Sequence, residues 1–111
     1  MVPRVTVIIA NYNYDAYISD AIQSAIDQDY AGPLSVCIVD DGSTDSSWEK
    51  IEGFFFNSEH EYVDDMKVTR GQDESGRVNL IGLKTRNGGA SVARNTGISF
   101  CLPDTDVYAI L

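Results

Sequence analysis

The sequence predicts an α/β domain in which helices cover both faces of a mostly parallel sheet. Two continuous apolar runs, residues 5–10 and 34–39, have the composition of strands buried on both faces, and residues 79–84 predict a third strand. Helical periodicity occupies the segments between and after these runs, so strands and helices alternate along the chain. Right-handed crossovers between parallel strands then place helices on both faces.

The helices are predicted from apolar residues that recur at helical spacing. This spacing runs from residue 16 to residue 28, with polar residues on the opposite side. Ser46 and Glu49 stand three positions apart and predict a capping box, which opens a second helix reaching residue 55. A third helix is expected over residues 90–101.

The segment of residues 57–77 is polar and acidic, and it has no clear period. We expect it to form an irregular insertion at the surface. Residues 107–111 begin a fourth strand, where the pattern stops. Because 111 residues suffice for one domain at most, we expect residues 1–111 to form a single domain interrupted by this insertion.

The formal net charge of −9 limits the partners of the chain. Nucleic acid and anionic membrane surfaces both require a concentrated basic face, so neither is expected as a partner. A ligand that carries phosphate would need a local cation, either a metal ion or a well-placed arginine or lysine.

The two cysteines, Cys37 and Cys101, are too few and too far apart to predict a zinc site. Both fall in apolar segments, where buried free thiols are expected, and this usage is typical of a reducing compartment. The apolar run near the N-terminus is too short for a signal peptide or a spanning helix. We therefore expect a cytoplasmic location, with attachment to the inner face of a membrane through segments outside this chain as the alternative.

Polar and small residues follow each of the three predicted strands at the point where the strand ends. In open parallel α/β sheets, ligands bind outside these carboxyl ends. The candidate binding residues are Ala10 and Tyr12 after the first strand, Asp40 and Asp41 after the second, and Asn87 and Gly88 after the third.

Such an edge suits a nucleotide. The face of Tyr12 can stack on a base, which contributes about 1–3 kcal/mol. A fixed carboxylate can accept a hydrogen bond from a base N–H or a ribose hydroxyl, and glycines allow backbone to approach a ligand just ahead of a helix N-terminus. Taken singly, each motif is better explained as a turn, because Asp, Asn and Gly are common turn formers. Their occurrence at three strand ends together favours a ligand site.

Three stretches, VTVIIANYN, VDDGSTD and NGGASVARNTG, occur in this order and spacing. Together they make the chain resemble the N-terminal half of glycosyltransferase family 2 enzymes over nearly its whole length, apart from residues 57–77. The resemblance implies a Rossmann-like sheet of the GT-A type, here incomplete. It also implies the transfer of a sugar from a nucleotide diphosphate donor.

By this resemblance, Ala10 and Tyr12 match the residues that hold the nucleobase, usually uracil. Asp41 matches the acid that recognises the base, and Asp40 matches its neighbour nearer the ribose. Ala10 stands where many members carry proline, a departure that is tolerated if the backbone carbonyl makes the contact.

Arg94 and Asn95 match the helix that lines the nucleotide site after the glycine-rich turn. The family's Asp-x-Asp metal motif follows the fourth strand, and this chain ends at Leu111, where that motif would begin. The literal D-x-D at residues 104–106 precedes the strand instead, so we expect a helix-to-strand turn there and no metal ligands. The resemblance thus implies Mg²⁺ or Mn²⁺ in the full-length enzyme, with the metal ligands and the catalytic base outside this chain.

The expected function is that of a fragment of an inverting glycosyltransferase that binds a nucleotide-sugar donor. The whole enzyme would transfer the sugar of a UDP-sugar to a hydroxyl of a sugar, lipid or protein acceptor. We expect the chain alone to bind UDP weakly and to transfer no sugar. It should also self-associate as a dimer or larger species, because its sheet is cut at the fourth strand.

Other functions are weighed against this one. A receiver-like phospho-acceptor signalling domain also has an apolar strand that ends in Val-Asp-Asp, but there the acid pair follows the first strand, whereas here it follows the second. A non-catalytic nucleotide-binding fragment is the other alternative. A dinucleotide oxidoreductase would need G-x-G-x-x-G after the first strand, where this chain reads ANYNYDAY.

Overall fold

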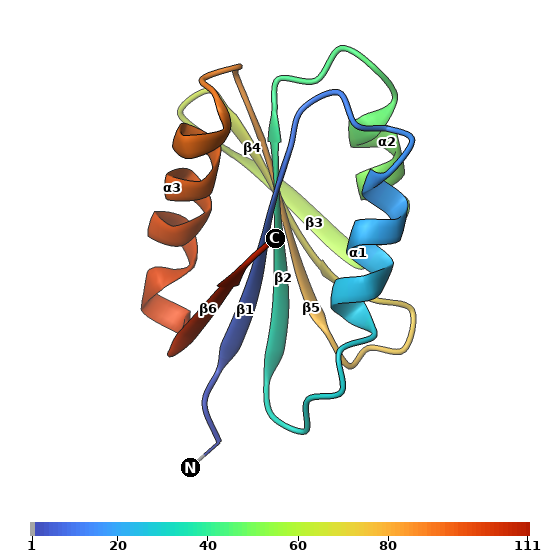
Figure 1. Cartoon of the computed structure of the whole chain (residues 1–111), viewed down its shortest axis with the longest axis vertical. Coiled ribbons are helices and arrows are strands. Elements are labelled where there is room, and N and C mark those ends of the chain that lie inside the picture. Colours follow the sequence, from blue (N-terminus) through green and yellow to red (C-terminus); the bar gives the residue numbers. More distant parts are fainter. Residues whose placement is uncertain (1) are drawn as a thin grey trace.

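The structure, a computed structural model, describes residues 2–111 apart from the side chains of Ala90, Ser91 and Leu102. It contains one six-stranded sheet in the order β3-β4-β5-β2-β1-β6, with helices on both sides (Figure 1). The strands are β1 (Val5–Asn11), β2 (Leu34–Asp41), β3 (Phe56–Val63), β4 (Met66–Gln72), β5 (Asn79–Thr85) and β6 (Val107–Ile110). The helices are α1 (Ile18–Ile26), α2 (Ser47–Glu52), α3 (Ala90–Cys101) and the short 3-10 helix η1 (Leu102–Asp104). The predicted α/β class, with its Rossmann-like sheet, is confirmed.

The strand β2 lies at the centre of the parallel part of the sheet. It pairs in parallel with β1 on one side and with β5 on the other, and β6 pairs in parallel with β1. Asn11 is opposite Asp40 and Asp41 is opposite Thr85, so the carboxyl ends of the three strands lie at one edge. Residues 36–39 of β2 are fully excluded from solvent, as a strand covered on both faces must be.

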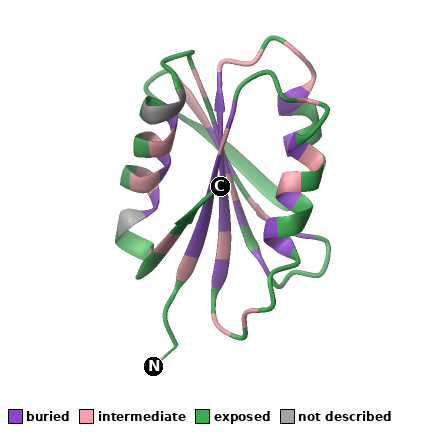
Figure 2. Ribbon diagram, viewed as in Figure 1, coloured by how far each residue is buried: buried purple, intermediate pink, exposed green. Residues whose placement is uncertain are grey.

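Helices cover both faces of the sheet, as predicted. α1 and α2 lie on one side and α3 lies on the other (Figure 1). The face under α1 and α2 presents Val7, Ile9, Val36, Ile38 and Leu80, and the face under α3 presents Ile8, Cys37, Val39, Val68 and Leu83. Figure 2 shows the buried residues gathered in the central strands and on the inner sides of the helices. Because successive side chains of a strand point to opposite faces, continuous apolar runs fill both cores.

The helix α3 lies close to the sheet because Gly97 has no side chain. A Cβ at this position would lie 2.9 Å from Cγ2 of Ile8 and 3.0 Å from Cγ2 of Val39. Protein interiors are packed as densely as organic crystals, so a larger residue here must displace either the helix or the strands.

The first two helices are shorter than the sequence predicts. α1 covers Ile18–Ile26 instead of residues 16–28, and α2 ends at Glu52 instead of residue 55. Gly53 is the C-cap residue of α2, and its backbone amide donates to the carbonyl of Glu49 at 3.1 Å. Among the described helices, none is both long and apolar enough to cross a lipid bilayer.

The predicted capping box at the start of α2 is wrong. Ser46 makes no side-chain cap, because its hydroxyl donates to Oδ2 of Asp15 at 2.9 Å. Oδ1 of Asp45 instead accepts a hydrogen bond from the amide of Ser47 at 2.9 Å. The first turn of α2 is therefore stabilised by an acid that precedes the expected cap residue.

The expectation of an irregular segment at residues 57–77 is also wrong. Most of this segment forms β3 and β4, an antiparallel hairpin that pairs with β5 and widens the sheet. All eight residues of β3 are exposed. No face of this strand is buried, and its sequence lacks the apolar alternation that predicts a half-buried strand. Pairing with β4, in which Val68 and Thr69 are buried, defines this strand instead.

The turn between β4 and β5 is built around Asp73, which is 8% exposed. Its Oδ1 accepts from the amide of Val78 at 2.9 Å, and its Oδ2 accepts from the hydroxyl of Ser75 at 2.8 Å. Burial raises the pKa of the Asp73 carboxyl, but these hydrogen bonds outweigh burial and hold the pKa below its usual value.

The literal D-x-D at residues 104–106 lies at the amino edge of the sheet, opposite the strand ends that carry the candidate site. It starts at Asp104, the last residue of η1, and leads into β6, as the sequence predicts for a helix-to-strand turn. Asp106 accepts from the backbone amide of Arg4 at 2.9 Å and pairs with its guanidinium at 3.3 Å. These hydrogen bonds lower the pKa of the Asp106 carboxyl. Because Arg4 precedes β1 and Asp106 precedes β6, the pair joins the starts of these two neighbouring strands.

We predict that Gly97→Ala destabilises the fold. Alanine gains about 1 kcal/mol of helix propensity over glycine, but overpacking of this kind costs about 1–3 kcal/mol. Urea unfolding should therefore show a net loss of about 1 kcal/mol. Ser99→Ala, on the exposed side of α3, is the control and should leave stability unchanged or slightly raised. Equal or greater stability of Gly97→Ala would contradict the packing described above.

We predict that Asp73 makes stability depend on acid pH. Its folded pKa is depressed, so the stabilisation is present above the ordinary carboxyl pKa and is lost as pH falls through the folded value. Asp73→Asn should lower the free energy of unfolding at pH 7 by about 1–2 kcal/mol. The difference between the variant and the wild type should become smaller toward pH 2, where the wild-type carboxyl is protonated. Urea unfolding at several pH values measures both effects. The exposed neighbour Glu74→Gln is the control, and a deficit that stays constant with pH would refute this role.

Candidate functional site

The candidate site lies at the carboxyl ends of β1, β2 and β5, which are at the top of the view in Figure 1. The parallel register brings Asn11, Asp40, Asp41 and Thr85 to this edge. The three loops that follow these strands therefore meet at one place. The sequence predicts this convergence correctly.

Asp40 is fully buried at the end of β2. Its Oδ1 accepts from Nδ2 of Asn11 at 3.0 Å and from the hydroxyl of Ser43 at 2.6 Å. Its Oδ2 is buried too, and within residues 2–111 as described it has no hydrogen-bond partner. Such a buried, unpartnered carboxylate oxygen is uncommon, and it leaves one strong acceptor available inside the site.

Asp41 is 3% exposed and binds the glycine-rich turn that follows β5. Its Oδ1 accepts from the amide of Gly88, and its Oδ2 accepts from the amide of Gly89, each at 2.8 Å. Hydrogen bonds to a carboxylate are roughly twice as strong as neutral ones, so this pair fixes the loop ahead of α3. Asp41 therefore fixes the backbone of the glycine-rich turn in addition to placing a negative charge at this edge.

Gly42 allows the loop after β2 to contact the loop after β5. Its φ of 75° lies in the left-handed region that favours glycine. A Cβ at Gly42 would also lie 2.6 Å from the backbone nitrogen of Asn87. Both the backbone conformation and the close approach exclude a side chain here, which explains the glycine of the VDDGS stretch.

The loops after β1 and β2 are joined by Asn13, which has a φ of 54°. Its Oδ1 accepts from the amide of Thr44 at 2.8 Å, and its own amide donates to the hydroxyl of Ser43 at 2.9 Å. Sequence reasoning did not assign a role to Asn11, Asn13 or Ser43. Their positions directly after the strands were the available signal, because such positions supply the donors that buried carboxylates require.

A second link between these loops involves two further acids. Oδ2 of Asp45 accepts from the amide of Asp15 at 3.1 Å, while Asp15 accepts from Ser46. Burial opposes ionisation of Asp45, but hydrogen bonds from Ser47 and Asp15 outweigh it and hold the pKa of its carboxyl below the usual value. The β1 and β2 loops are thus a connected, preorganised unit.

Tyr12 and Ala10 lie at the end of β1, beside this unit. Tyr12 is 43% exposed, so part of its ring is accessible to a ligand. Ala10 is half-buried and pairs in the sheet with Val39. Tyr12 follows Asn11, whose side chain binds Asp40, so an accessible aromatic residue and a buried carboxylate occupy the same edge of the sheet. Such an edge can hold a planar, hydrogen-bonding group.

The predicted residues that follow β5 are placed in different ways. The amide of Gly88 binds Asp41, and Asn87 is exposed next to Gly42. Arg94 is half-buried on α3, and Asn95 is exposed.

Asn95 lines an open groove of about 510 Å³ beside α3. Met66 of β4 and Val92 and Phe100 of α3 line the same groove, and Asn95 makes none of the hydrogen bonds to Asp40 and Asp41.

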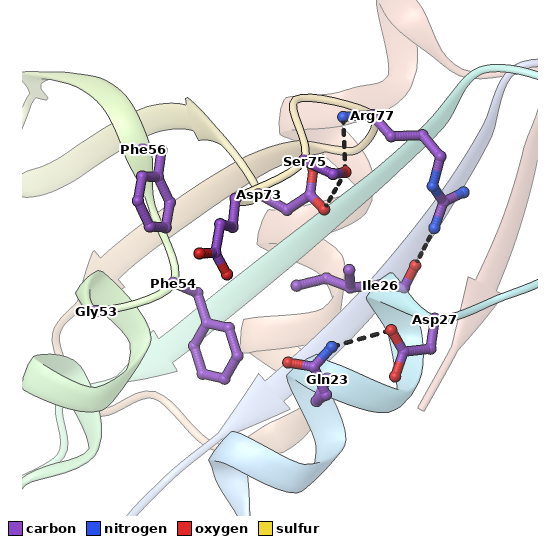
Figure 3. A pocket seen from close by; sticks show the side chains of 10 residues that line it. Gln23, Ile26, Asp27, Gly53, Phe54, Phe56, Asp73, Ser75 and Arg77 are labelled. Atoms are coloured by element: carbon purple, nitrogen blue, oxygen red, sulfur yellow. Dashed lines mark hydrogen bonds between the residues drawn. The ribbon is translucent and has the colours of Figure 1, made fainter.

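A cavity of about 690 Å³ lies away from these strand ends (Figure 3). It is formed by the ends of α1 and α2 together with the turn between β4 and β5, at the amino edge of the parallel strands. Its charged lining residues are Asp27, Asp73, Glu74 and Arg77, and Arg77 donates to the carbonyl of Ile26. This excess of acids does not suit a phosphate-bearing ligand.

The acids that the structure describes are not arranged around a metal ion. Across the part of the chain that the structure describes, no group of three or more His, Cys, Asp or Glu side chains gathers to hold a metal ion. Both oxygens of Asp41 accept from amides, and Asp40 is buried against Asn11 and Ser43. The described carboxylates therefore do not fit a divalent cation by themselves.

We predict that Asp41→Asn loosens the glycine-rich turn while the sheet stays folded. An asparagine offers one neutral acceptor in place of two charged ones, so the amides of Gly88 and Gly89 should exchange with solvent roughly tenfold faster. Hydrogen exchange followed by NMR measures this change. Asp29→Asn, at an exposed acid, is the control. Unchanged exchange at both glycine amides would show that Asp41 does not hold the turn.

Comparison with known proteins agrees with this arrangement. The sequence profile of the family described as Glycosyl transferase family 2 matches residues 6–111. Similar proteins include an uncharacterized glycosyltransferase of Nostoc sp. (48% identical over 48 residues), the hyaluronan synthase of Pasteurella multocida (32% over 99) and the chondroitin synthase of Escherichia coli (32% over 100).

These alignments cover 43%, 89% and 90% of this chain, but 15%, 8% and 12% of the respective relatives. The chain thus spans a small part of the length of the curated relatives that it matches. The family profile, in contrast, extends over all three strand ends and the loops that Asp40 and Asp41 hold together. On this match the chain belongs to glycosyl transferase family 2.

Proposed function

We propose that this chain binds the nucleotide of a UDP-sugar donor at the carboxyl ends of β1, β2 and β5. The observation that carries the proposal is the buried pair Asp40 and Asp41. One acid fixes the loops after β1 and β2, and the other fixes the turn after β5. Oδ2 of Asp40 still has no donor among the described residues, so a ligand N–H or hydroxyl can complete its bonding after a small loop movement.

The proposed roles follow from exposure and bonding. Tyr12 stacks on the base, because its ring is accessible at the end of β1. Asp40 accepts from the base or the ribose, and Asp41 holds the turn at Gly88 against the site. The first turn of α3 follows this glycine-rich turn, and a helix N-terminus favours the negative charge of a diphosphate.

We further propose that the whole protein transfers the donor sugar with inversion to an acceptor hydroxyl. Family membership supports glycosyl transfer, and the names of two relatives, a hyaluronan synthase and a chondroitin synthase, agree with it. Inversion takes a single in-line displacement, in which a base removes the proton of the acceptor hydroxyl as the nucleoside diphosphate leaves. The residues described here supply the donor side of that reaction.

The described carboxylates do not fit a metal ion by themselves, so none of them acts as a metal ligand in the proposed binding. Added Mg²⁺ should still favour binding of UDP, since it reduces the repulsion between the diphosphate and a chain of net charge −9. This effect needs no protein ligand to the cation.

We predict that Tyr12→Ala weakens UDP binding roughly tenfold or more, because the stacking contribution of about 1–3 kcal/mol is lost. An NMR titration of the labelled chain with UDP, with and without Mg²⁺, measures affinity and locates the site. Perturbed resonances should map to Tyr12, Asp40, Asp41 and the turn at Gly88.

The matched control is Tyr62→Ala. Tyr62 is 67% exposed and lies on β3, the strand at the far edge of the sheet, so UDP affinity should not change. Equal losses in both variants, or perturbations confined to other parts of the chain, would count against the proposed site. Tyr12 contributes little to the core, so the variant tests binding without unfolding the protein.

A further inference from the structure

The two cysteines, far apart in sequence, meet in the core between β2 and α3. Cys37 is fully excluded from solvent on β2, and Cys101, the last residue of α3, is 3% exposed. Both are free thiols, and both belong to the apolar cluster under α3. Each thiol shifts the pKa of the other, so the two side chains interact within this cluster.

The packing of α3 accounts for this contact. Gly97 lies one turn before Cys101, and a Cβ at Gly97 would lie 3.7 Å from Sγ of Cys37. The absence of a side chain at Gly97 therefore allows the end of α3 to pack closely against β2. Close packing of the core then holds the two sulfur atoms near one another.

The two thiols differ in their access to solvent. Cys101 lines a cavity of about 60 Å³ together with Arg70, Phe100 and Asp104. A larger depression of about 380 Å³ shares Arg70 and Asp104 with it, so the two hollows adjoin. A space of this size can admit a molecule as small as water or hydrogen peroxide. Cys37 is not among the residues that line either hollow.

The thiols also differ in protonation. The interaction with Cys37 lowers the pKa of the Cys101 thiol; Arg70 acts in the same direction, while burial and Asp104 oppose both. The same interaction and burial raise the pKa of Cys37. Cys101 thus has the greater thiolate character, and the thiolate is the reactive form of cysteine.

We propose that Cys101 and Cys37 form a peroxide-sensitive pair, in which Cys101 reacts with hydrogen peroxide and Cys37 converts the product into a disulfide between α3 and β2. In the first step the Cys101 thiolate attacks the peroxide, an S–O bond forms and the O–O bond breaks. Hydroxide leaves, and Cys101 becomes a sulfenic acid.

In the second step the sulfur of Cys37 gives up its proton and attacks the sulfur of Cys101. The S–S bond forms, the S–O bond breaks, and the leaving hydroxide takes up the proton as water. Two thiols thereby lose two electrons to one peroxide, which is reduced to water. The disulfide adds a covalent link at one end of α3, while hydrogen bonds from Gly88 and Gly89 to Asp41 tie the segment at its other end to β2.

The first test is treatment of the full 111-residue chain with hydrogen peroxide, followed by intact mass measurement. The expected result is a monomer lighter by roughly 2 Da that has no alkylatable thiol after unfolding and recovers both thiols with dithiothreitol. The closed loop should also raise Tm by roughly 10 °C. Retention of both thiols, or disulfides formed only between chains, would overturn the proposal.

Single variants assign the roles. Cys37→Ser should stop at a sulfenic acid on Cys101, which dimedone labels and tandem mass spectrometry distinguishes from oxidised methionine. Cys101→Ser should leave Cys37 unreacted, and reaction of Cys37 at the wild-type rate would refute the order of events. The wild-type mass measurement stands even if either variant folds poorly.

A charge variant tests the role of the cavity. Arg70→Gln should slow formation of the disulfide several-fold without changing its final yield, because Arg70 favours the Cys101 thiolate. Arg4→Gln is the matched control, since Arg4 lines the adjoining depression but not the cavity at Cys101. Equal rates in both variants and the wild type would contradict this route of access.

Discussion

Two adjacent carboxylates are buried at the end of the central strand, and the arrangement of the surrounding loops depends on this constraint. A buried carboxylate that lacks hydrogen bonds costs several kcal/mol, so donors have to be brought to it from elsewhere in the fold. Asp40 receives donors from the β1 side and from its own loop, whereas Asp41 receives two amides from the β5 side. The acid pair therefore connects all three loops at the carboxyl edge of the sheet.

The two apolar layers fix the position of this edge of the sheet. β2 is packed on both faces and paired along both sides, so Asp40 and Asp41 project from the most deeply buried strand of the molecule. α3 approaches the same strand closely at Gly97. The glycine-rich turn that precedes α3 binds Asp41 at the end of this strand. The amino edge has a separate role, because Asp73 and the Arg4–Asp106 pair stabilise turns and strand ends there.

Family membership and the structure explain the motif residues in complementary ways. The VDDGS stretch that marks the family also performs a structural task, in which Gly42 admits the neighbouring loop and Asp41 holds it. In the proposed donor site the neighbouring Asp40, which also binds Asn11 and Ser43, would contact the nucleotide. A residue that both builds a site and binds in it tolerates few substitutions, because either loss is enough to disable it. The receiver-like alternative does not fit this family.

The β3–β4 hairpin shows most clearly the difference between structure that a local sequence pattern predicts and structure that depends on tertiary pairing. The central strands could be predicted because their apolar runs must fill two cores, and the acids at their ends follow from that placement. β3 could not be predicted, because all of its side chains are exposed and only its pairing with β4 gives it structure.

Other features of the site and core show the same division. The sequence alone predicted the fold class, the parallel core, the edge that carries Tyr12, Asp40 and Asp41, and the place of the D-x-D turn. The tertiary structure decided that Asp41 binds two glycine amides, that Asn95 lines a groove beside α3 and β4, and that Cys37 and Cys101 share one apolar cluster. The physical reason is that apolar periodicity is encoded locally, whereas hydrogen-bond partners and core contacts depend on segments that only the folded chain brings together.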